Sequence, residues 1–201
     1  EANAEIHQNT TGNEIINDFS EIGLDYWVSG YGTGGTVSGV GRVLREKSPQ
    51  TKIILSEPEN ASLIGSKLKQ DRNSDNTPAS SHSSWNPHLI QGWTPDFIPF
   101  VLQETIDNNY FDQLIPVSGE QGIVWAKRLA RAEGIITGIS GGSTFAVAME
   151  IAKTAPPDSN ILCMLADTGE RYLSSPLFED IPEEMTEDEQ KISVSTPNYQ
   201  L

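Results

Sequence analysis

Residues 27–44 read WVSGYGTGGTVSGVGRVL, and this stretch decides the fold. The apolar residues before Gly30 are typical of a buried strand, and valine and leucine recur at helical spacing after the glycines. We therefore predict a strand over 26–29, a glycine-rich turn and a helix over 36–47.

The glycine-rich turn predicts an anion-binding site. Where a strand turns through glycines into a helix, free backbone N–H groups and the positive end of the helix dipole converge. Glycine lets the backbone approach an anion closely, and threonine hydroxyls add hydrogen-bond donors. The expected ligand is a phosphate group, bound among Gly30, Gly32, Thr33, Gly34, Gly35 and Thr36.

Two other interpretations of this turn stay open. Gly30, Gly32 and Gly35 satisfy G-x-G-x-x-G, and Glu57 follows 22 residues after the last of them, which is the spacing of a dinucleotide-binding fingerprint. The turn could also serve only close packing of strand and helix. A Walker-type loop is excluded because no Lys-Ser/Thr pair follows the glycines.

The rest of the chain alternates strand-like and helix-like segments. We expect strands over 52–56, 113–117 and 161–165, and helices over 120–133 and 143–153. The helix over 120–133 would end at Gly134 and place Ile123, Val124, Lys127 and Ala130 on one face. This order predicts an α/β fold of three layers, with a largely parallel twisted sheet and helices on both faces.

A second glycine cluster, GIITGISGGS at 134–143, leads directly into an apolar helix. Its glycines would let a flat group lie against the backbone, and Ser140 could bond a polar atom of that group. The alternative is that Ser140 or Ser143 caps the helix.

Several motifs taken in order resemble one family. YGTGGT, SEPENA, HLIQGW, EGIITGISGGS and LADTGERYLS follow one another as in cysteine synthases (O-acetylserine sulfhydrylases), which are fold-type II pyridoxal-phosphate enzymes, and IHQNTTGNEI is similar to the segment before the phosphate loop. The resemblance covers nearly all of residues 1–180, which it implies are most of the larger, pyridoxal-phosphate-binding domain. Residues 181–201 would be an acidic C-terminal tail.

The resemblance implies a set of site residues. Ser140 would bond the pyridine nitrogen, and a hydroxyl partner, unlike a carboxylate, does not hold that nitrogen protonated. Such a cofactor suits β-elimination and β-replacement. Gly92 would lie on the substrate side, where Trp93, Thr94 and Pro95 replace the small residues common in the family. The cofactor phosphate would be bound by Gly32, Thr33, Gly34, Gly35 and Thr36.

The implied reaction converts O-acetyl-L-serine and sulfide to L-cysteine and acetate. The family's Schiff-base lysine belongs to a small N-terminal domain upstream of the segment that this chain matches, so no catalytic residue is assigned here. The chain would be the C-terminal part of a longer enzyme and inactive alone. The family also implies a homodimer and a possible partner in the C-terminal tail of serine acetyltransferase. The lysines present match no family motif: Lys47, Lys52, Lys67, Lys69, Lys127, Lys153 and Lys191.

Other functions remain alternatives. Within the same fold these are a cystathionine β-synthase-like or a serine/threonine dehydratase-like enzyme, and GERYLS argues against both. A nicotinamide-dinucleotide-binding oxidoreductase domain and a non-catalytic binding protein derived from the family come from other classes.

The composition further limits which partners are expected. The 201 residues carry 28 acidic and 13 basic side chains, a net charge of -15, so nucleic acid and anionic lipid are not expected as ligands. No apolar run is long enough for a transmembrane helix. A single cysteine excludes an internal disulfide and favours a reducing compartment. We expect a cytoplasmic protein, with an organelle such as a plastid as the alternative.

The remaining candidates have structural interpretations. Cys163 lies in a strand pattern and is expected in the core, and Glu170 and Arg171 are expected to form a structural pair. Residues 66–99 are either a functional loop or a mobile insertion. The acidic tail is interpreted as a solvated or disordered end, and no metal site is expected. The three histidines are expected in surface or loop roles: His7, His82 and His88.

Overall fold

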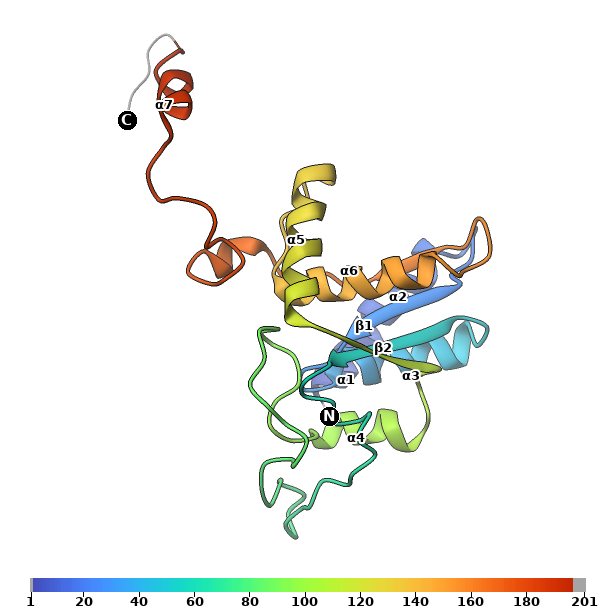
Figure 1. The fold of residues 1–201 in the computed structure, drawn as a ribbon. Helices are drawn as coiled ribbons and strands as arrows, with labels where there is room; N and C mark the ends of the chain where they lie inside the picture. The colour runs from blue at the N-terminus through green and yellow to red at the C-terminus, as the bar shows by residue number, and fades with distance from the viewer. Residues whose placement is uncertain (1, 197–201) are drawn as a thin grey trace.

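The computed structural model describes residues 2–196 and has the predicted α/β architecture (Figure 1). Its four strands are all parallel and lie in the order β3-β2-β1-β4. The elements in chain order are α1 (Ala2–Asn9), α2 (Thr11–Asp18), β1 (Tyr26–Gly30), α3 (Gly35–Lys47), β2 (Lys52–Pro58), α4 (Phe100–Asp107), β3 (Gln113–Val117), α5 (Gly119–Glu133), α6 (Ile139–Ala152), β4 (Ile161–Cys163), the 3-10 helix η1 (Gly169–Tyr172) and α7 (Glu187–Ser193).

Both faces of the sheet are buried under helices. Trp27 and Ile53 are paired across β1 and β2 and pack on one face with α2, α3 and α4. The next pair, Val28 and Ile54, packs on the other face with α5 and α6. Because side chains alternate along a strand, consecutive residues fill two separate cores, which explains why these strands are apolar throughout.

The strand order creates a switch point next to β1. The chain builds β2 and β3 on one side of β1 and then returns to place β4 on the other side. In open parallel sheets ligands bind at the carboxyl ends of the strands, at such a switch point. The glycine turn after β1 and the segment after β4 therefore meet at the expected place for a site.

Helix α6 begins earlier than predicted. It starts at Ile139 and not at Ser143, and its N-cap is Gly138, without a side-chain cap. The alternative interpretation, in which Ser140 or Ser143 caps this helix, is therefore wrong. Ser143 lies within the helix, where its hydroxyl donates to the Ile139 carbonyl at 2.9 Å. Gly141 and Gly142 lie within the helix, where a Cβ on either would collide with neighbouring residues.

The same packing shows that the predicted apolar face of α5 is not the face that is buried. Val124 is 47% exposed, whereas Gly122, Ala126 and Leu129 are buried. A Cβ on Gly122 would lie 2.2 Å from Ser143 Oγ, and a Cβ on Gly142 would lie 2.1 Å from the Gly122 carbonyl oxygen. The contact between α5 and α6 thus uses small residues, which a search for bulky apolar side chains overlooks. Gly134 ends α5 in the left-handed conformation, as predicted.

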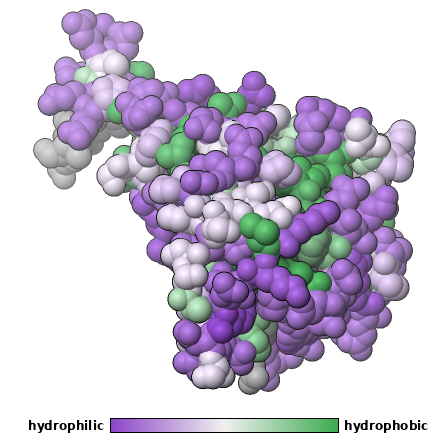
Figure 2. Space-filling model, turned by 60° about the horizontal axis from the view of Figure 1, so that its bottom comes forward, coloured by the Kyte–Doolittle hydropathy of each residue, from purple (hydrophilic) through white to green (hydrophobic). Residues whose placement is uncertain are grey.

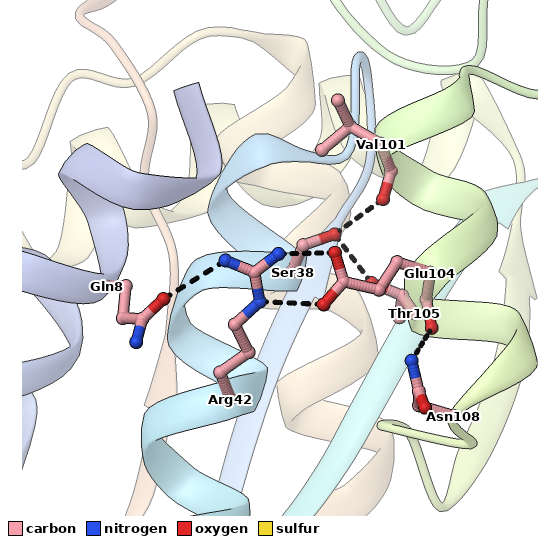
Figure 3. A network of polar contacts seen from close by, with 7 residues as sticks. All are labelled: Gln8, Ser38, Arg42, Val101, Glu104, Thr105 and Asn108. Atoms are coloured by element: carbon pink, nitrogen blue, oxygen red, sulfur yellow. Dashed lines mark hydrogen bonds and ion pairs between the residues drawn. The ribbon is translucent and has the colours of Figure 1, made fainter. Parts of the chain in front are cut away.

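A polar network ties α3 to the helices beside it (Figure 3). Arg42 on α3 binds both carboxylate oxygens of Glu104 on α4, with Nε to Oε1 at 2.7 Å, and its Nη1 donates to Gln8 Oε1 on α1 at 3.0 Å. Ser38, one turn earlier on α3, donates to the Val101 carbonyl at 2.9 Å. The network holds the helix that carries the glycine turn against α1 and α4.

We expect Glu104→Gln to lower the free energy of unfolding by about 1 kcal/mol at pH 7, because a two-bond arginine pair is strong but this one is about one-third exposed. Arg42 lowers the pKa of Glu104, chiefly through its hydrogen bonds. A lowered folded-state pKa stabilises the protein above the unfolded pKa and ceases to do so as the pH falls through the folded one. Urea unfolding measured from pH 7 to pH 3 should therefore show that the unfolding free energies of the wild type and of Glu104→Gln converge in acid. Glu46→Gln, at an exposed site on α3, is the control, and a difference that persists unchanged into acid would contradict the assignment.

The C-terminal residues project from the body as an arm (Figure 1). It contains the short helix α7, in which no residue is buried. Figure 2 shows mainly hydrophilic side chains on this arm and over most of the face in view. The tail is solvated, as predicted, although residues 197–201 of it lie outside the described part of the chain. Within residues 2–196 no helix is long and apolar enough to cross a membrane.

Candidate functional site

A cavity of about 460 Å³ lies at the carboxyl ends of β1 and β4. Its size is that of a small-molecule site. The residues after β1 form one wall, the residues after β4 and the first turn of α6 form another, and the segment 91–93 closes a third side. The lining includes every residue that the resemblance implied for the cofactor and substrate: Gly32, Thr33, Gly34, Gly35, Thr36, Gly92 and Ser140.

The glycine turn presents free backbone donors to this cavity. Gly34 is the N-cap of α3, has φ +89 and makes no side-chain cap bond, so the first N–H groups of the helix have no partner from a capping side chain. A Cβ on Gly35 would lie 2.3 Å from the side chain of Asn3, whose Nδ2 donates to Thr33 Oγ1 at 2.9 Å. The turn is therefore a backbone cradle with two hydroxyls at its edge, Thr33 and Thr36, which suits a phosphate group.

His7 is part of the cavity wall. Its Nε2 lies 3.1 Å from Thr36 Oγ1, and its Nδ1 lies 3.0 Å from Thr11 Oγ1. The expectation of a surface or loop role for this histidine is wrong, because it lies on α1 and positions a hydroxyl of the glycine turn. The spacing of four residues to Thr11 is visible in the sequence, but Thr36 is 29 residues away and only the fold brings it close.

The segment 91–94 packs directly on the glycine turn. A Cβ on Gly30 would lie 1.9 Å from Trp93 Cε2, and a Cβ on Gly32 would lie 2.3 Å from the Gly92 carbonyl oxygen. The Thr94 N–H donates to the Tyr31 carbonyl at 2.8 Å. Gly30 and Gly32 are thus needed for the segment 91–94 to lie so close to the turn. Residues 66–99 therefore contribute a wall of the site, in agreement with the interpretation of a functional loop.

The other end of the cavity holds a polar group of three side chains. Tyr172 of η1 donates its hydroxyl hydrogen to Asp167 Oδ2 at 2.5 Å, and both residues line the cavity beside Ser140. Burial and Asp167 raise the pKa of Tyr172 to about 12. The sequence pointed instead to a Glu170–Arg171 pair, but both of these residues are exposed and no ion pair joins them within the described residues. The Asp167–Tyr172 pair was missed because its two partners lie on either side of Glu170 and Arg171 in the sequence.

Glu57 does not lie in the cavity. It is 0% exposed, and its carboxylate accepts hydrogen bonds from Tyr31 Oη at 2.6 Å and Ser62 Oγ at 2.6 Å. The backbone N–H groups of Ile64 and Gly65 donate to it as well, at 3.1 and 2.9 Å. Burial and the adjacent carboxylate raise the pKa of Tyr31 far above its ordinary value. Glu57 is therefore fully engaged and cannot accept a ribose hydroxyl, which removes the main support for dinucleotide binding.

Cys163 has no role in the cavity. It lies in β4, packs against the core under α6, and its burial raises the pKa of the thiol to about 11. A thiol with this pKa is almost entirely protonated at neutral pH, so Cys163 is a core residue as predicted.

These walls fit pyridoxal 5′-phosphate. The α3 N-terminus is a cradle for a dianion, Ser140 offers a hydroxyl at the far wall, and Asp167 Oδ1 is buried without a hydrogen-bond partner in the structure. No lysine is among the residues that line the cavity in the described part of the chain.

The family model "Pyridoxal-phosphate dependent enzyme" matches residues 1–167. The chain belongs to this family. The cofactor of the protein is therefore pyridoxal phosphate.

Individual relatives agree with this assignment. The chain is 40% identical to O-ureido-L-serine synthase from Streptomyces lavendulae over 182 residues, which are 90% of this chain and 50% of the relative. It is 34% identical to cysteine synthase from Staphylococcus aureus over 177 residues, 88% of this chain and 51% of that one. The chain thus spans about half the length of the curated relatives it matches.

Solved structures of the same family superpose well. A structure of O-ureido-L-serine synthase matches with a TM-score of 0.79 and 38% identity, over 96% of this chain and 54% of the other. Cysteine synthase from Entamoeba histolytica matches with a TM-score of 0.72 and 30% identity, over 92% and 48%. The likeness therefore extends through almost the whole of this chain and confirms its place among the fold-type II pyridoxal-phosphate enzymes.

Proposed function

We propose that this chain forms most of the larger domain, over residues 1–180, of a cysteine synthase that converts O-acetyl-L-serine and sulfide to L-cysteine and acetate. The observation that carries the proposal is one cavity in which an uncapped helix N-terminus and the Ser140 hydroxyl face the same space. The motifs of this chain follow one another in the same order as in cysteine synthases, and the chain is 34% identical to the cysteine synthase of Staphylococcus aureus. Both findings support the proposal.

The residues of this chain would divide the work of binding. The N–H groups at the start of α3, with the hydroxyls of Thr33 and Thr36, would hold the phosphate and so anchor the cofactor. Ser140 would bond the ring nitrogen, and Gly92 would leave room for the substrate. When bound, pyridoxal phosphate supplies an electron sink for chemistry at the β-carbon of serine. The phosphate would be bound locally, since a net charge of -15 disfavours anions at long range.

The covalent anchor is proposed to come from outside this chain. The cavity lining of the described residues contains backbone donors, hydroxyls and His7 but no lysine. We therefore propose that a lysine from a small domain completes the site and that this chain alone does not catalyse β-replacement. A homodimer and binding of the serine acetyltransferase tail remain predictions.

A second candidate has its own support. The chain is 40% identical to O-ureido-L-serine synthase, and Trp93 makes the substrate side bulkier than in the common cysteine synthase pattern. In this alternative an oxygen nucleophile with a ureido group would take the place of sulfide. The two candidates differ in whether the product carries sulfur or oxygen on the β-carbon.

Binding of the phosphate end is tested with 4′-deoxypyridoxine 5′-phosphate, which keeps the phosphate and ring nitrogen of the cofactor but has no aldehyde to react with surface lysines. We expect saturable binding to the chain and about tenfold weaker affinity for Thr33→Val, which corresponds to the loss of one charge-assisted hydrogen bond. Calorimetric titration gives both constants.

The matched control is Thr77→Val, which removes the same hydroxyl from an exposed loop and should leave the affinity unchanged. Equal affinity for the wild type and Thr33→Val would contradict the placement of the phosphate.

A further inference from the structure

Two side chains of α1 bond the threonines of the glycine turn. Asn3 Nδ2 donates to Thr33 Oγ1 at 2.9 Å, and His7 Nε2 lies 3.1 Å from Thr36 Oγ1. Asn3 and His7 are four residues apart in α1, so they lie on the same face of this helix. A single helix therefore contacts both hydroxyls at the edge of the backbone cradle.

Helix α1 is packed tightly on α3 at these two positions. A Cβ on Gly35 would lie 2.3 Å from Asn3 Cγ, and a Cβ on Gly39 would lie 2.8 Å from His7 Cβ. The two glycines thus let α1 approach the first turns of α3 closely. Further along α3, the polar network in Figure 3 joins the same two helices. Asn3 and His7 are therefore held beside the threonines by the packing of their own helix.

The cavity offers a phosphate no lysine or arginine side chain. Neither residue type is among the cavity-lining residues in the described part of the chain. An anion at the glycine turn therefore depends on hydrogens from backbone N–H groups and hydroxyls. A threonine hydroxyl has one hydrogen, so it can donate to an anion only if that hydrogen is not given to a protein neighbour. The direction of the hydrogen bonds from α1 thus decides whether the threonines can bind phosphate.

At Thr33 this direction follows from the chemistry of the partner. The amide nitrogen of Asn3 has hydrogens to give and cannot accept, so Thr33 accepts with a lone pair and keeps its own hydrogen.

At Thr36 the direction depends on which ring nitrogen of His7 carries the hydrogen. His7 Nδ1 lies 3.0 Å from Thr11 Oγ1, and within residues 2–196 the Thr11 hydroxyl makes no other hydrogen bond. If Thr11 gives its hydrogen to Nδ1, the neutral ring carries its hydrogen on Nε2 and donates to Thr36. The opposite tautomer would accept the hydrogen of Thr36, whose lone pairs would then face the anion. A bound phosphate therefore favours the ring with hydrogen on Nε2.

We propose that α1 orients both hydroxyls of the cradle, so that each threonine hydrogen is free to donate to the phosphate of pyridoxal phosphate. Asn3 donates to Thr33 from its amide. His7 donates to Thr36 from Nε2, and Thr11 fixes the tautomer of the ring. This inference rests on the proposed function, because it assumes that the phosphate lies at the glycine turn. Asn3 and His7 are thus positioning residues that act through the two threonines.

The first test is a pair of double-mutant cycles, read as the affinity of the whole chain for 4′-deoxypyridoxine 5′-phosphate in calorimetric titrations. Asn3→Leu and His7→Leu each remove a donor but keep an extended side chain, and each should weaken binding about threefold. Asn3→Leu should cause no further loss in Thr33→Val, because the hydroxyl through which it acts is already absent. For the same reason, His7→Leu should cause no further loss in Thr36→Val. Across the two pairs the losses should multiply.

Asn9→Leu is the matched control, since it makes the same substitution at an exposed residue of α1 that does not line the cavity. Its affinity should equal that of the wild type. An equal loss in Asn9→Leu, or an undiminished loss from His7→Leu in Thr36→Val, would show that α1 acts only through packing and would overturn the inference. These results leave the proposed function intact as long as the wild type binds the probe and Thr33→Val weakens binding. If the wild type does not bind the probe saturably, the proposed function is contradicted and this inference with it.

The second test is the tautomer of His7 itself. The ¹⁵N chemical shifts of the ring nitrogens are measured in the wild-type chain with the probe bound, and the signals of His7 are assigned by their loss in His7→Leu. We expect a hydrogen on Nε2, which supports the direction from His7 to Thr36. A ring without a hydrogen on Nε2 would have to accept from Thr36 and would overturn the role of His7.

Discussion

Gly34→Ala should lower the free energy of unfolding by roughly 2–4 kcal/mol and weaken binding of 4′-deoxypyridoxine 5′-phosphate more than tenfold. Gly34 has φ +89, a conformation that disfavours any residue with a side chain. The added Cβ would also lie 2.7 Å from Leu102 Cβ and 2.8 Å from Leu102 Cα. Backbone atoms of α4 cannot move away as a flexible side chain can, so the turn itself must shift and its N–H groups would no longer converge.

Gly23→Ala is the control for this prediction. Gly23 has φ +75, but a Cβ there would meet nothing within 4 Å, so this variant carries the conformational strain without the collision. We expect it to cost about 1–2 kcal/mol and to leave probe binding unchanged. Urea unfolding and calorimetric titration of both variants separate the two effects, and equal losses at the two positions would refute the collision.

Glu57→Ala should cost roughly 3–5 kcal/mol of unfolding free energy, the largest effect that we expect from a residue outside the cavity. The variant leaves four buried or partly buried donors without their acceptor: the hydroxyls of Tyr31 and Ser62 and the N–H groups of Ile64 and Gly65. Probe affinity should fall too, because Tyr31 lies between two glycines of the turn and loses the bond that holds its ring.

The exposed neighbour Glu59 provides the comparison. Glu59→Ala removes a carboxylate two residues away and should change the unfolding free energy by less than about 0.5 kcal/mol. Urea unfolding at pH 7 measures both. Stability of Glu57→Ala within 1 kcal/mol of the wild type would show that these donors find other acceptors, such as water, and that the buried carboxylate does not stabilise the turn.

Local patterns in the sequence predicted the sheet and the strand-glycine-helix turn well. The strand over 113–117 has the predicted bounds, and α3 begins at Gly35, one residue before the predicted start. Apolar strands and a strand-glycine-helix order depend on neighbours in the chain, so periodicity can find them. The predicted strand over 161–165 was two residues too long because its last residues turn into the cavity wall.

The parts that failed depend on distant neighbours. The buried face of α5 follows from the glycines of α6, and the role of His7 follows from Thr36, and neither relation is local. Glu57 has the spacing of a ribose-binding carboxylate, yet the loop that follows β2 folds back and encloses it. The hydrogen bond between Asp167 and Tyr172 joins residues on either side of Glu170 and Arg171, which are both exposed. The opposite charges of Glu170 and Arg171 therefore suggested the wrong pair.

The strand order has a consequence for how the protein folds. Strand β1 pairs on one side with β2, the next strand in the sequence. On its other side it pairs with β4, where Tyr26 lies opposite Ile161, a residue that is synthesised only after most of the chain. Contacts between residues so far apart form slowly, because a long loop must close before any bond compensates for its entropy. During synthesis, the first three strands and the phosphate turn can therefore assemble before Ser140, Asp167 and Tyr172 are in place. The wall of the cavity that contains these three residues is completed last.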